Sequence, residues 1–223
     1  MSIIEEMISV VPNKHQQKTE ATKKRLLKSA VRVFAKKGVQ AASIDDIARD
    51  AGYTRGAFYA NFKSKEDLFF ALIEQRTAED LVALRSKVSQ TTNDRQKIEL
   101  LRDFYASRIR AREWGLLMLE FKLYVARNGK MRLKLAERFK ALRDHIRLQY
   151  VAELGPSSVA ELCKSSGEKM VVLGAILDGL TLRRAYEPGL LSDEAAEEIL
   201  CDLFDTVMSP MMGALERDAS EIA

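Results

Sequence analysis

A short stretch of the chain concentrates side chains that suit contact with a nucleic acid. It carries Thr54, Arg55, Tyr59, Asn61 and Lys65. An arginine can fork onto a guanine or a phosphate, an asparagine can pair with adenine, and threonine and tyrosine hydroxyls reach phosphate oxygens. A lysine at the start of a helix places a cation beside free backbone amides, where a phosphate can dock. These residue types predict a surface that contacts DNA.

The elements that must position these side chains have the pattern of a helix-turn-helix. Ser43 followed by Asp46 has the form of a capping box, so a first helix is expected to begin at Ile44. Gly52 can adopt the left-handed conformation that ends this helix, and Thr54 can cap a second helix directly after it. The spacing therefore predicts two short helices joined by a tight turn.

The second helix is expected to depend on packing rather than on its own propensity. It contains Gly56, which lets another backbone come close, and several aromatic residues. Its apolar side chains Ala57, Phe58 and Phe62 would pack onto the preceding helices. Ser64 can cap a third helix that starts at the next residue. A packed corner of three helices with a solvated polar face is the alternative interpretation.

Residues 22–70 resemble the DNA-binding domain of the TetR family of bacterial transcriptional regulators. The residues that carry the resemblance are Ala30, Phe34, Gly38, Ser43, Ile47, Ala48, Ala51, Gly52, Gly56, Tyr59, Phe62, Ser64, Lys65, Leu68 and Leu72. In that family the second short helix enters the major groove. The resemblance implies a DNA-binding set of Ser43, Thr54, Arg55, Gly56, Tyr59, Asn61 and Lys65. The chain departs from many relatives at Phe58 and Ala60, and the alanine removes one potential base contact.

Charge is distributed unevenly along the 223 residues, whose net charge is +4. Residues 1–65 hold 13 Lys and Arg against 6 Asp and Glu, a surplus of +7, and the remaining 23 against 26 give −3. A basic amino-terminal third is what an electrostatic footprint on DNA requires. Residues 1–21 are expected to form a flexible arm that adds phosphate or minor-groove contacts or is simply a solvated tail. Its candidate cations, with those just beyond it, are Lys14, Lys18, Lys23, Lys24 and Arg25.

The fold is predicted to be all-α. A helix over 22–37, ended by Gly38, would complete a three-helix DNA-binding domain at 22–68, and a larger helical effector-binding and dimerisation domain would occupy 69–223. The punctuation of the larger domain by Asn, Gly and Pro predicts helices over 65–88, 94–112, 114–128, 130–154, 168–186 and 192–216, with a kink or restart at Pro210.

The later helices carry so many apolar residues that each is expected to be buried on more than one side. One destination is a pocket for a hydrophobic or amphipathic ligand, with ordinary core packing as the alternative. Its candidate residues are Phe104, Tyr105, Trp114, Met118, Phe121, Tyr124, Phe139, His145, Met170, Leu173 and Leu177. Glu120 and Asp178 are acidic residues within apolar stretches. They could bind a cationic ligand or form ion pairs with Arg127, Arg183 or Arg184.

A second destination for the apolar surface is a homodimer interface. The last two long helices have broad apolar faces and small residues, which favour a four-helix bundle with a twofold mate. The candidate interface residues are Val172, Ile176, Gly179, Arg183, Leu203, Phe204, Val207 and Met211. Two DNA-binding domains on a twofold axis would need a palindromic operator.

Several classes of protein are disfavoured by the sequence. No Gly-rich phosphate loop and no metal-spaced His and Cys set is present, so we expect neither an enzyme nor a cofactor or metal site. No apolar run approaches the roughly 20 residues that span a bilayer, which predicts a cytoplasmic protein without a membrane partner. Cys163 and Cys201 are expected to be buried small residues, with a redox pair as the alternative.

The function expected from these features is ligand-responsive transcriptional regulation. The chain would bind a palindromic operator as a dimer, repress a promoter, and be released by a small-molecule effector that favours a different spacing of the two DNA-binding domains. A DNA-binding activator and an architectural protein without small-molecule control are the alternatives.

Overall fold

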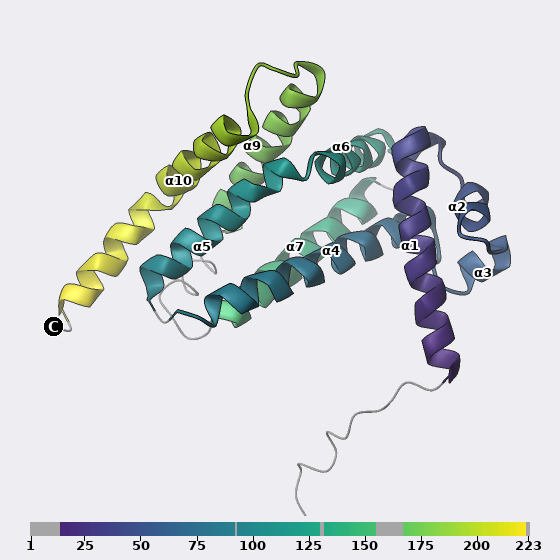
Figure 1. Ribbon diagram of the computed structural model, residues 1–223, viewed down its shortest axis with the longest axis horizontal. Coiled ribbons are helices and arrows are strands. Elements are labelled where there is room, and N and C mark those ends of the chain that lie inside the picture. Colours follow the sequence, from purple (N-terminus) through teal and green to yellow (C-terminus); the bar gives the residue numbers. More distant parts are fainter. Residues whose placement is uncertain (1–13, 92, 130–131, 155–166, 222–223) are drawn as a thin grey trace, which may run out of the picture. The chain divides into compact units, whose positions relative to one another are not determined.

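The structure is a computed structural model that describes residues 14–91, 93–129, 132–154 and 167–221; within these ranges the side chains of residues 15, 154 and 209–221 are not described. Every regular element in those ranges is a helix, as predicted (Figure 1). The chain divides into two compact units, the first ending at Glu74 and the second beginning at Gln75.

The first unit contains three complete helices and the beginning of a fourth. They are α1 (Lys14–Ala41), α2 (Ile44–Asp50), α3 (Arg55–Tyr59) and α4 (Lys65–Val88), which continues into the second unit. Their apolar faces meet in one core. Its fully buried members are Leu26, Ala30, Phe34, Ile47, Phe58, Leu68, Phe69 and Phe70.

The first helix begins at Lys14, eight residues before the predicted start at residue 22. Its opening turns contain neither glycine nor proline, and the Thr22 hydroxyl donates to the carbonyl of Lys18. Residues 14–21 are therefore helical rather than part of a flexible arm, and residues 1–13 lie outside the described residues. Gly38 interrupts α1 with φ 76° and ψ 158°, close to the predicted end.

The second unit packs the remainder of α4 with the later helices. These are α5 (Asp94–Ser107), the 3₁₀ helix η2 (Arg108–Arg110), α6 (Arg112–Arg127), α7 (Arg132–Leu154), α9 (Gly167–Tyr186) and α10 (Asp193–Glu221). Helix α10 packs against α5 and α9, and α6 packs against α9 and α7. A core that includes Leu84, Tyr105, Leu173, Leu200 and Phe204 joins α4, α5, α9 and α10.

The helices of this unit follow the predicted ranges except at the end of α5, at Pro210, and at the end of α10, which lies at Glu221 rather than at residue 216. The helix expected over 94–112 ends at Ser107, because the chain tightens into η2 before α6 begins. Helix α10 runs through Pro210 as one element, so the predicted restart there is wrong. A single proline removes one backbone hydrogen bond, and a long helix held by packing along its earlier turns sustains that loss.

Among the residues that the structure describes, no helix is long and apolar enough to cross a membrane. In the same part of the chain, no group of three or more His, Cys, Asp and Glu side chains is arranged to hold a metal ion.

Candidate DNA-binding surface

Helix α2 begins with the predicted capping box. The Ser43 hydroxyl accepts from the backbone amide of Asp46 at 3.1 Å, and the amide of Ser43 donates to the Asp46 carboxylate at 3.2 Å. Lys37 of α1 donates to the other carboxylate oxygen at 2.7 Å. These hydrogen bonds, that from Lys37 foremost, lower the pKa of Asp46. The Ser43 hydroxyl, predicted to contact DNA, is thus already engaged in holding the start of α2.

A second pair of contacts fixes α2 against α1. The buried hydroxyl of Ser29 lies 2.8 Å from the carbonyl oxygen of Ile47 and 2.7 Å from the carboxylate of Asp50, and these two acceptors share its single proton. Arg32, one helical turn further along α1, forms an ion pair with the same carboxylate at 2.5 Å. The hydrogen bonds from Ser29 and then Arg32 lower the pKa of Asp50. These links orient α2, and with it the turn into α3.

The turn and the cap of α3 are those that the sequence predicts. Gly52 has φ +75°, a value that side chains disfavour, and the Thr54 hydroxyl accepts from the amide of Ala57 at 3.2 Å. Phe58 is fully buried, and its ring lies 5.8 Å from that of Phe62. A helix of five residues is too short to persist alone, so this packing sustains it.

Arg55 and Tyr59 lie one turn apart on the exposed face of α3. The guanidinium of Arg55 lies over the Tyr59 ring, 5.6 Å from its centre, and Nη2 lies 3.4 Å from the Tyr59 hydroxyl. Nη1 donates to the carboxylate of Asp45 in α2 at 2.8 Å. Sequence reasoning did not single out Asp45. Its position ten residues before Arg55, on the other side of the turn, could have indicated the ion pair.

Gly56 lies exposed between these side chains. A Cβ at this position would meet only the Thr54 hydroxyl, at 3.7 Å, which is ordinary van der Waals contact. The packing of the free protein therefore does not require a glycine here. Because glycine has no side chain, the backbone of α3 is exposed at this position.

Asn61 and Lys65 turn toward the protein. The Asn61 side-chain amide donates to the carbonyl of Ala57 at 2.8 Å, while its Oδ1 is buried without a hydrogen-bond partner among the described residues. The Lys65 ammonium donates to the carbonyls of Val39 and Ala42 at the end of α1. Its burial lowers the pKa of Lys65. In this arrangement neither side chain points a donor outward from α3.

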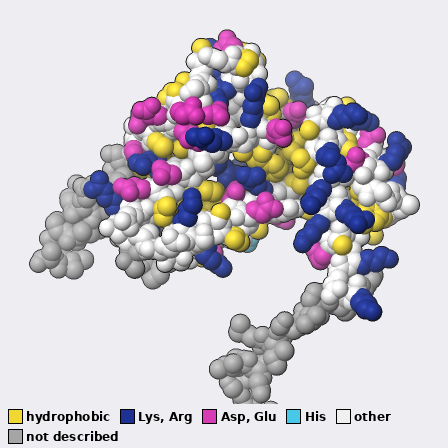
Figure 2. All heavy atoms as spheres, in the orientation of Figure 1, with side chains coloured by type: hydrophobic (Ala, Val, Ile, Leu, Met, Phe, Trp, Pro, Cys, Tyr) yellow, Lys and Arg dark blue, Asp and Glu magenta, His cyan; other side chains and the backbone are white. Residues whose placement is uncertain are grey.

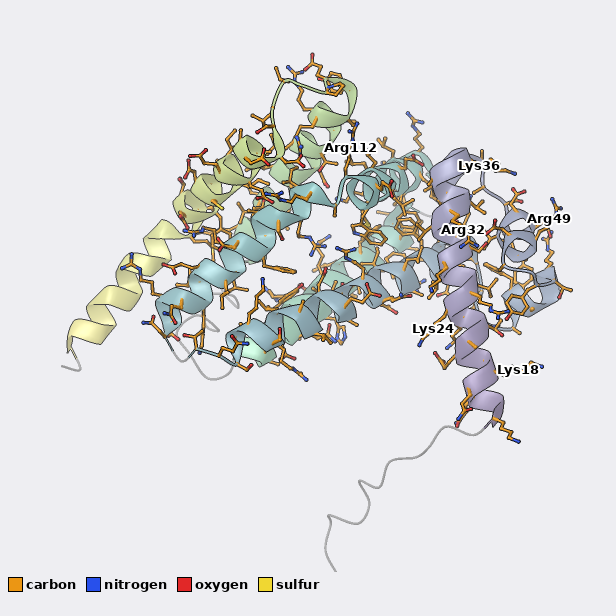
Figure 3. All side chains as sticks on the ribbon, in the orientation of Figure 1. Lys18, Lys24, Arg32, Lys36, Arg49 and Arg112 are labelled. Carbon is orange, nitrogen blue, oxygen red and sulfur yellow. The ribbon has the colours of Figure 1, made fainter. Side chains whose placement is uncertain are left out.

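Basic side chains follow the exposed side of α1. Figure 3 shows Lys18, Lys24, Arg32 and Lys36 on successive parts of the helix, with Arg49 on α2. In the space-filling view, dark blue side chains form a line along the same helix (Figure 2). The helical extension of α1 therefore holds Lys18, one of the predicted arm cations, on an ordered element. This basic surface lies on the same unit as α3.

The predicted pocket residues separate into a group around Phe121 and a group around Tyr105. The Phe121 ring is buried and lies 5.7 Å from Phe139 and 6.0 Å from Tyr124. Tyr105 donates its hydroxyl to the carbonyl of Leu173, and burial raises the pKa of Tyr105. Phe104, Trp114, Met118 and Leu177 are half-buried, whereas His145 and Met170 are exposed.

The predicted dimer residues also differ in exposure. Val172, Gly179 and Arg183 are exposed on α9, and Ile176 is half-buried beside the core. On α10, Phe204 is only 3% exposed and packs on Tyr105 within its own unit, with Leu203 and Val207 half-buried. Met211 falls on α10 where the side chain is outside the described part of the structure.

The remaining candidates have ordinary structural settings. Asp178 pairs with Lys122 of α6 at 2.5 Å rather than with one of the expected arginines, because Lys122 faces it across the α6 and α9 contact. Glu120 is exposed. Cys201 is a free, half-buried thiol whose pKa is raised by burial, and Cys163 lies outside the described residues.

Comparison with known proteins finds sequence similarity to transcriptional regulators, which is highest in the first unit. The similarity of fold includes both units. Residues 26–72 match the model of the bacterial regulatory proteins of the tetR family. The chain is 26% identical over 187 residues to the uncharacterized HTH-type transcriptional regulator YwcC of Bacillus subtilis, covering 79% of this chain and 82% of that protein. It is 43% identical over 61 residues to the HTH-type transcriptional regulator AcrR of Shigella flexneri, covering 27% and 28%.

Solved structures share the helical fold over most of the chain. A TetR-family transcriptional regulator from Rhodococcus sp. superposes with a TM-score of 0.62, covering 85% of this chain and 99% of that one at 22% identity. The likeness shows the fold. Sequence similarity is therefore concentrated in the unit that contains α2 and α3, while the helical arrangement extends over both units.

Proposed function

We infer that this chain, which belongs to the TetR family of bacterial regulatory proteins, is a dimeric repressor that binds a palindromic operator and is released by a hydrophobic or amphipathic small molecule. The observation that carries the proposal is the exposed face of α3, where Arg55, Gly56 and Tyr59 stand together on a helix held by caps and packing. Such a face suits the major groove.

In the proposed complex, Arg55 and Tyr59 meet the DNA directly, and Gly56 lets the α3 backbone approach it. Ser43 and Thr54 hold the helix starts, and the exposed Thr54 hydroxyl, which accepts from Ala57, can also donate to a phosphate, whereas the Ser43 hydroxyl donates to Asp46. Asn61 and Lys65 contribute by fixing the end of α3 and the end of α1, since their donors are directed to backbone carbonyls. Cations along α1 supply attraction that is independent of sequence.

The proposed dimer forms through α9 and α10. Val172 is 53% exposed although it is apolar, and Leu182 and Ile199 are also exposed on these two helices. A Cβ at Gly179 would meet nothing within 4 Å, so another helix can come close there. Burying this surface against a second copy would place two DNA-binding units on a twofold axis. Phe204 supports the interface from within its own core.

The proposed effector occupies the region of α6 and α7 around Phe121. Met118, Tyr124 and Trp114 are half-buried there, and such side chains suit an apolar or amphipathic ligand. Helix α4 begins in the first unit and ends in the second, so a change in its second half is passed to the DNA-binding unit. A thousandfold loss of operator affinity requires a preference of about 4 kcal/mol for the released state.

The experiment that tests the proposed regulator is fluorescence anisotropy of the purified chain on the DNA upstream of its own gene. A scrambled duplex is the control, and both are titrated across a salt series. Selective binding with two protomers or more per site is expected. Equal, weak binding to both duplexes that vanishes with salt would contradict the proposal. With the assay in hand, candidate effectors are those that raise the melting temperature and lower operator affinity.

An architectural protein without effector control remains the second candidate. The basic stretch of α1 favours it, because such cations bind any DNA sequence. It predicts no ligand that changes operator affinity. An activator would bind selectively and raise transcription from the adjacent promoter in a reporter strain, where the proposed repressor lowers it.

A further inference from the structure

Asp45 places a carboxylate on the surface that we propose contacts DNA. It lies in the first turn of α2, and its Oδ2 is 2.8 Å from Nη1 of Arg55. Tyr59 contacts the same guanidinium through its ring face and its hydroxyl. Arg55 is thus fixed between one residue of α2 and one of α3, although its side chain is 59% exposed.

The fixed geometry matters more for a base than for a phosphate. A guanidinium has five N–H donors, and the contacts with Asp45 and Tyr59 leave enough of them for a bidentate bond to the O6 and N7 of guanine. That bond requires the plane of the guanidinium to be aligned with the base. A phosphate accepts a cation from many directions and would not need the alignment.

The stability of the fold does not explain the pair well. Both partners are largely exposed, at 59% and 47%, and ion pairs of this kind contribute little to folding. On a DNA-contacting surface the carboxylate has a second effect. It repels the phosphates of every sequence and offsets the attraction of Arg55 for them, so it disfavours non-specific binding.

We propose that Asp45 is a positioning residue that aligns Arg55 for a bidentate contact with a guanine in each operator half-site, and that it thereby sets the discrimination between operator and non-specific DNA. The proposal rests on the proposed function. It assigns to Asp45 a role that is separate from the caps at Ser43 and Thr54, and it predicts one base of the operator.

The test compares the full chain with Asp45→Asn on the operator and on the scrambled duplex at one salt concentration. The ratio of the two affinities should fall roughly tenfold or more, with stronger binding to the scrambled duplex contributing to the loss. Glu74→Gln is the matched control, since it removes one exposed carboxylate from the same unit and leaves Arg55 untouched. The control should keep the ratio of the wild type.

Two further measurements separate positioning from a general effect of charge. Replacing each operator guanine in turn by 7-deazaguanine removes the N7 acceptor, and at one position the wild type should lose affinity about tenfold while Asp45→Asn loses less. In an Arg55→Ala background, Asp45→Asn should change the affinity ratio much less, because only the repulsion between the carboxylate and the phosphates is then removed. Thermal melting of every variant checks that the DNA-binding unit is folded.

An unchanged ratio in Asp45→Asn would overturn the proposal, and so would an equal fall of the ratio in the Arg55→Ala background. If every 7-deazaguanine substitution lowered the affinity of the wild type equally, the proposal would also be contradicted. A wild-type chain that binds both duplexes alike would instead sink the proposed function itself. The two failures are therefore distinguishable in the same titrations.

Discussion

The ammonium nitrogen of Lys65 lies 2.6 Å from the carbonyl oxygen of Val39, and it also donates to Ala42 at 2.9 Å. A lysine at the start of α4 thereby caps the end of α1, twenty-six residues earlier in the chain. The last carbonyls of a helix have no partner within it, and the half-buried ammonium of Lys65 donates to carbonyls at this end. The residue therefore joins the two helices that enclose the core of the DNA-binding unit.

Substitution of Lys65 by alanine should destabilise this unit. Removing the ammonium takes a hydrogen-bond donor from the carbonyls of Val39 and Ala42 at the end of α1, at a cost of about 1–3 kcal/mol. Urea unfolding of the full chain, followed by the signal of the first unit, measures the loss. Lys63→Ala is the matched control, since Lys63 is exposed and carries the same charge. Equal stability of the two variants would show that the carbonyl contacts are unimportant.

Acid should weaken the DNA-binding unit through Asp46. Hydrogen bonds from Lys37 and Ser43 lower the pKa of this carboxyl in the folded state. A group with a depressed pKa contributes stability that is complete above its unfolded pKa, near 3.8, and is lost as the pH falls toward the folded value. The free energy of unfolding should therefore fall below about pH 4, and it should fall less steeply in Asp46→Asn.

The measurement for Asp46 is a series of urea titrations across the acid range. Ser43→Ala removes the hydroxyl that donates to the Asp46 carboxylate at 2.7 Å and caps α2, so it should lower stability at neutral pH by about 1 kcal/mol and also flatten the acid slope. Parallel pH curves for the wild type and Asp46→Asn would contradict the assignment of the acid sensitivity to this residue.

Gly56→Ala should separate DNA binding from folding. A Cβ there would have only one neighbour, at 3.7 Å, and alanine is the better helix former, so stability should rise by up to about 1 kcal/mol. Operator affinity should nevertheless fall, because a methyl group would stand between the α3 backbone and the groove. Anisotropy and thermal melting are measured on the same preparation.

Gly52→Ala is the informative counterpart. Nothing lies within 4 Å of a Cβ at Gly52, yet its φ of +75° disfavours a side chain, so this variant should lose about 1 kcal/mol of stability. The free space around the Cβ positions of Gly52 and Gly56 would by itself predict that both accept alanine. If Gly56→Ala kept full operator affinity, the close approach of the α3 backbone to DNA would be wrong.

The local features of the DNA-binding unit could be predicted from sequence because they are made by neighbouring residues. Ser43 and Thr54 cap helices that start at the next residue, and Gly52 supplies the turn between them. The predicted span of α4, residues 65–88, matches the structure for the same reason. Caps and breakers act within a few residues, and their positions can be read directly.

The directions of several side chains could not be predicted, since tertiary packing decides them. Lys65 carries the same charge whether it meets a phosphate or the end of α1, and only the approach of the two helices selects the second. The pairing of Asp45 with Arg55 likewise depends on the crossing of α2 and α3. Phe204 has the apolar character of an interface residue, yet it is buried in the core of its own unit. Helical spacing shows that such a side chain is buried, but it does not show whether a second copy or the same chain buries it.

The last prediction concerns how α4 is held in the second unit. Asp80 of α4 is 13% exposed and pairs with Arg108 of η2 at 2.8 Å, while Arg76 pairs with its other oxygen. Arg108 in turn lies over the Phe104 ring, 5.5 Å from its centre. Tyr150 of α7 is half-buried near this pair, and its burial raises its pKa to about 12. The pair therefore joins α4 to η2 at the point where α5 ends and α6 is about to begin.

Because η2 leads directly into α6, we expect this pair to carry part of the effect on α4 of a ligand bound near Phe121. Asp80→Asn removes the ion pair and retains the shape of the side chain. Operator binding without ligand should stay close to that of the wild type, whereas the loss of affinity caused by an effector should shrink severalfold. Asp94→Asn, at the start of α5 and away from η2, is the control. An unchanged effector response in Asp80→Asn would place the coupling elsewhere along α4.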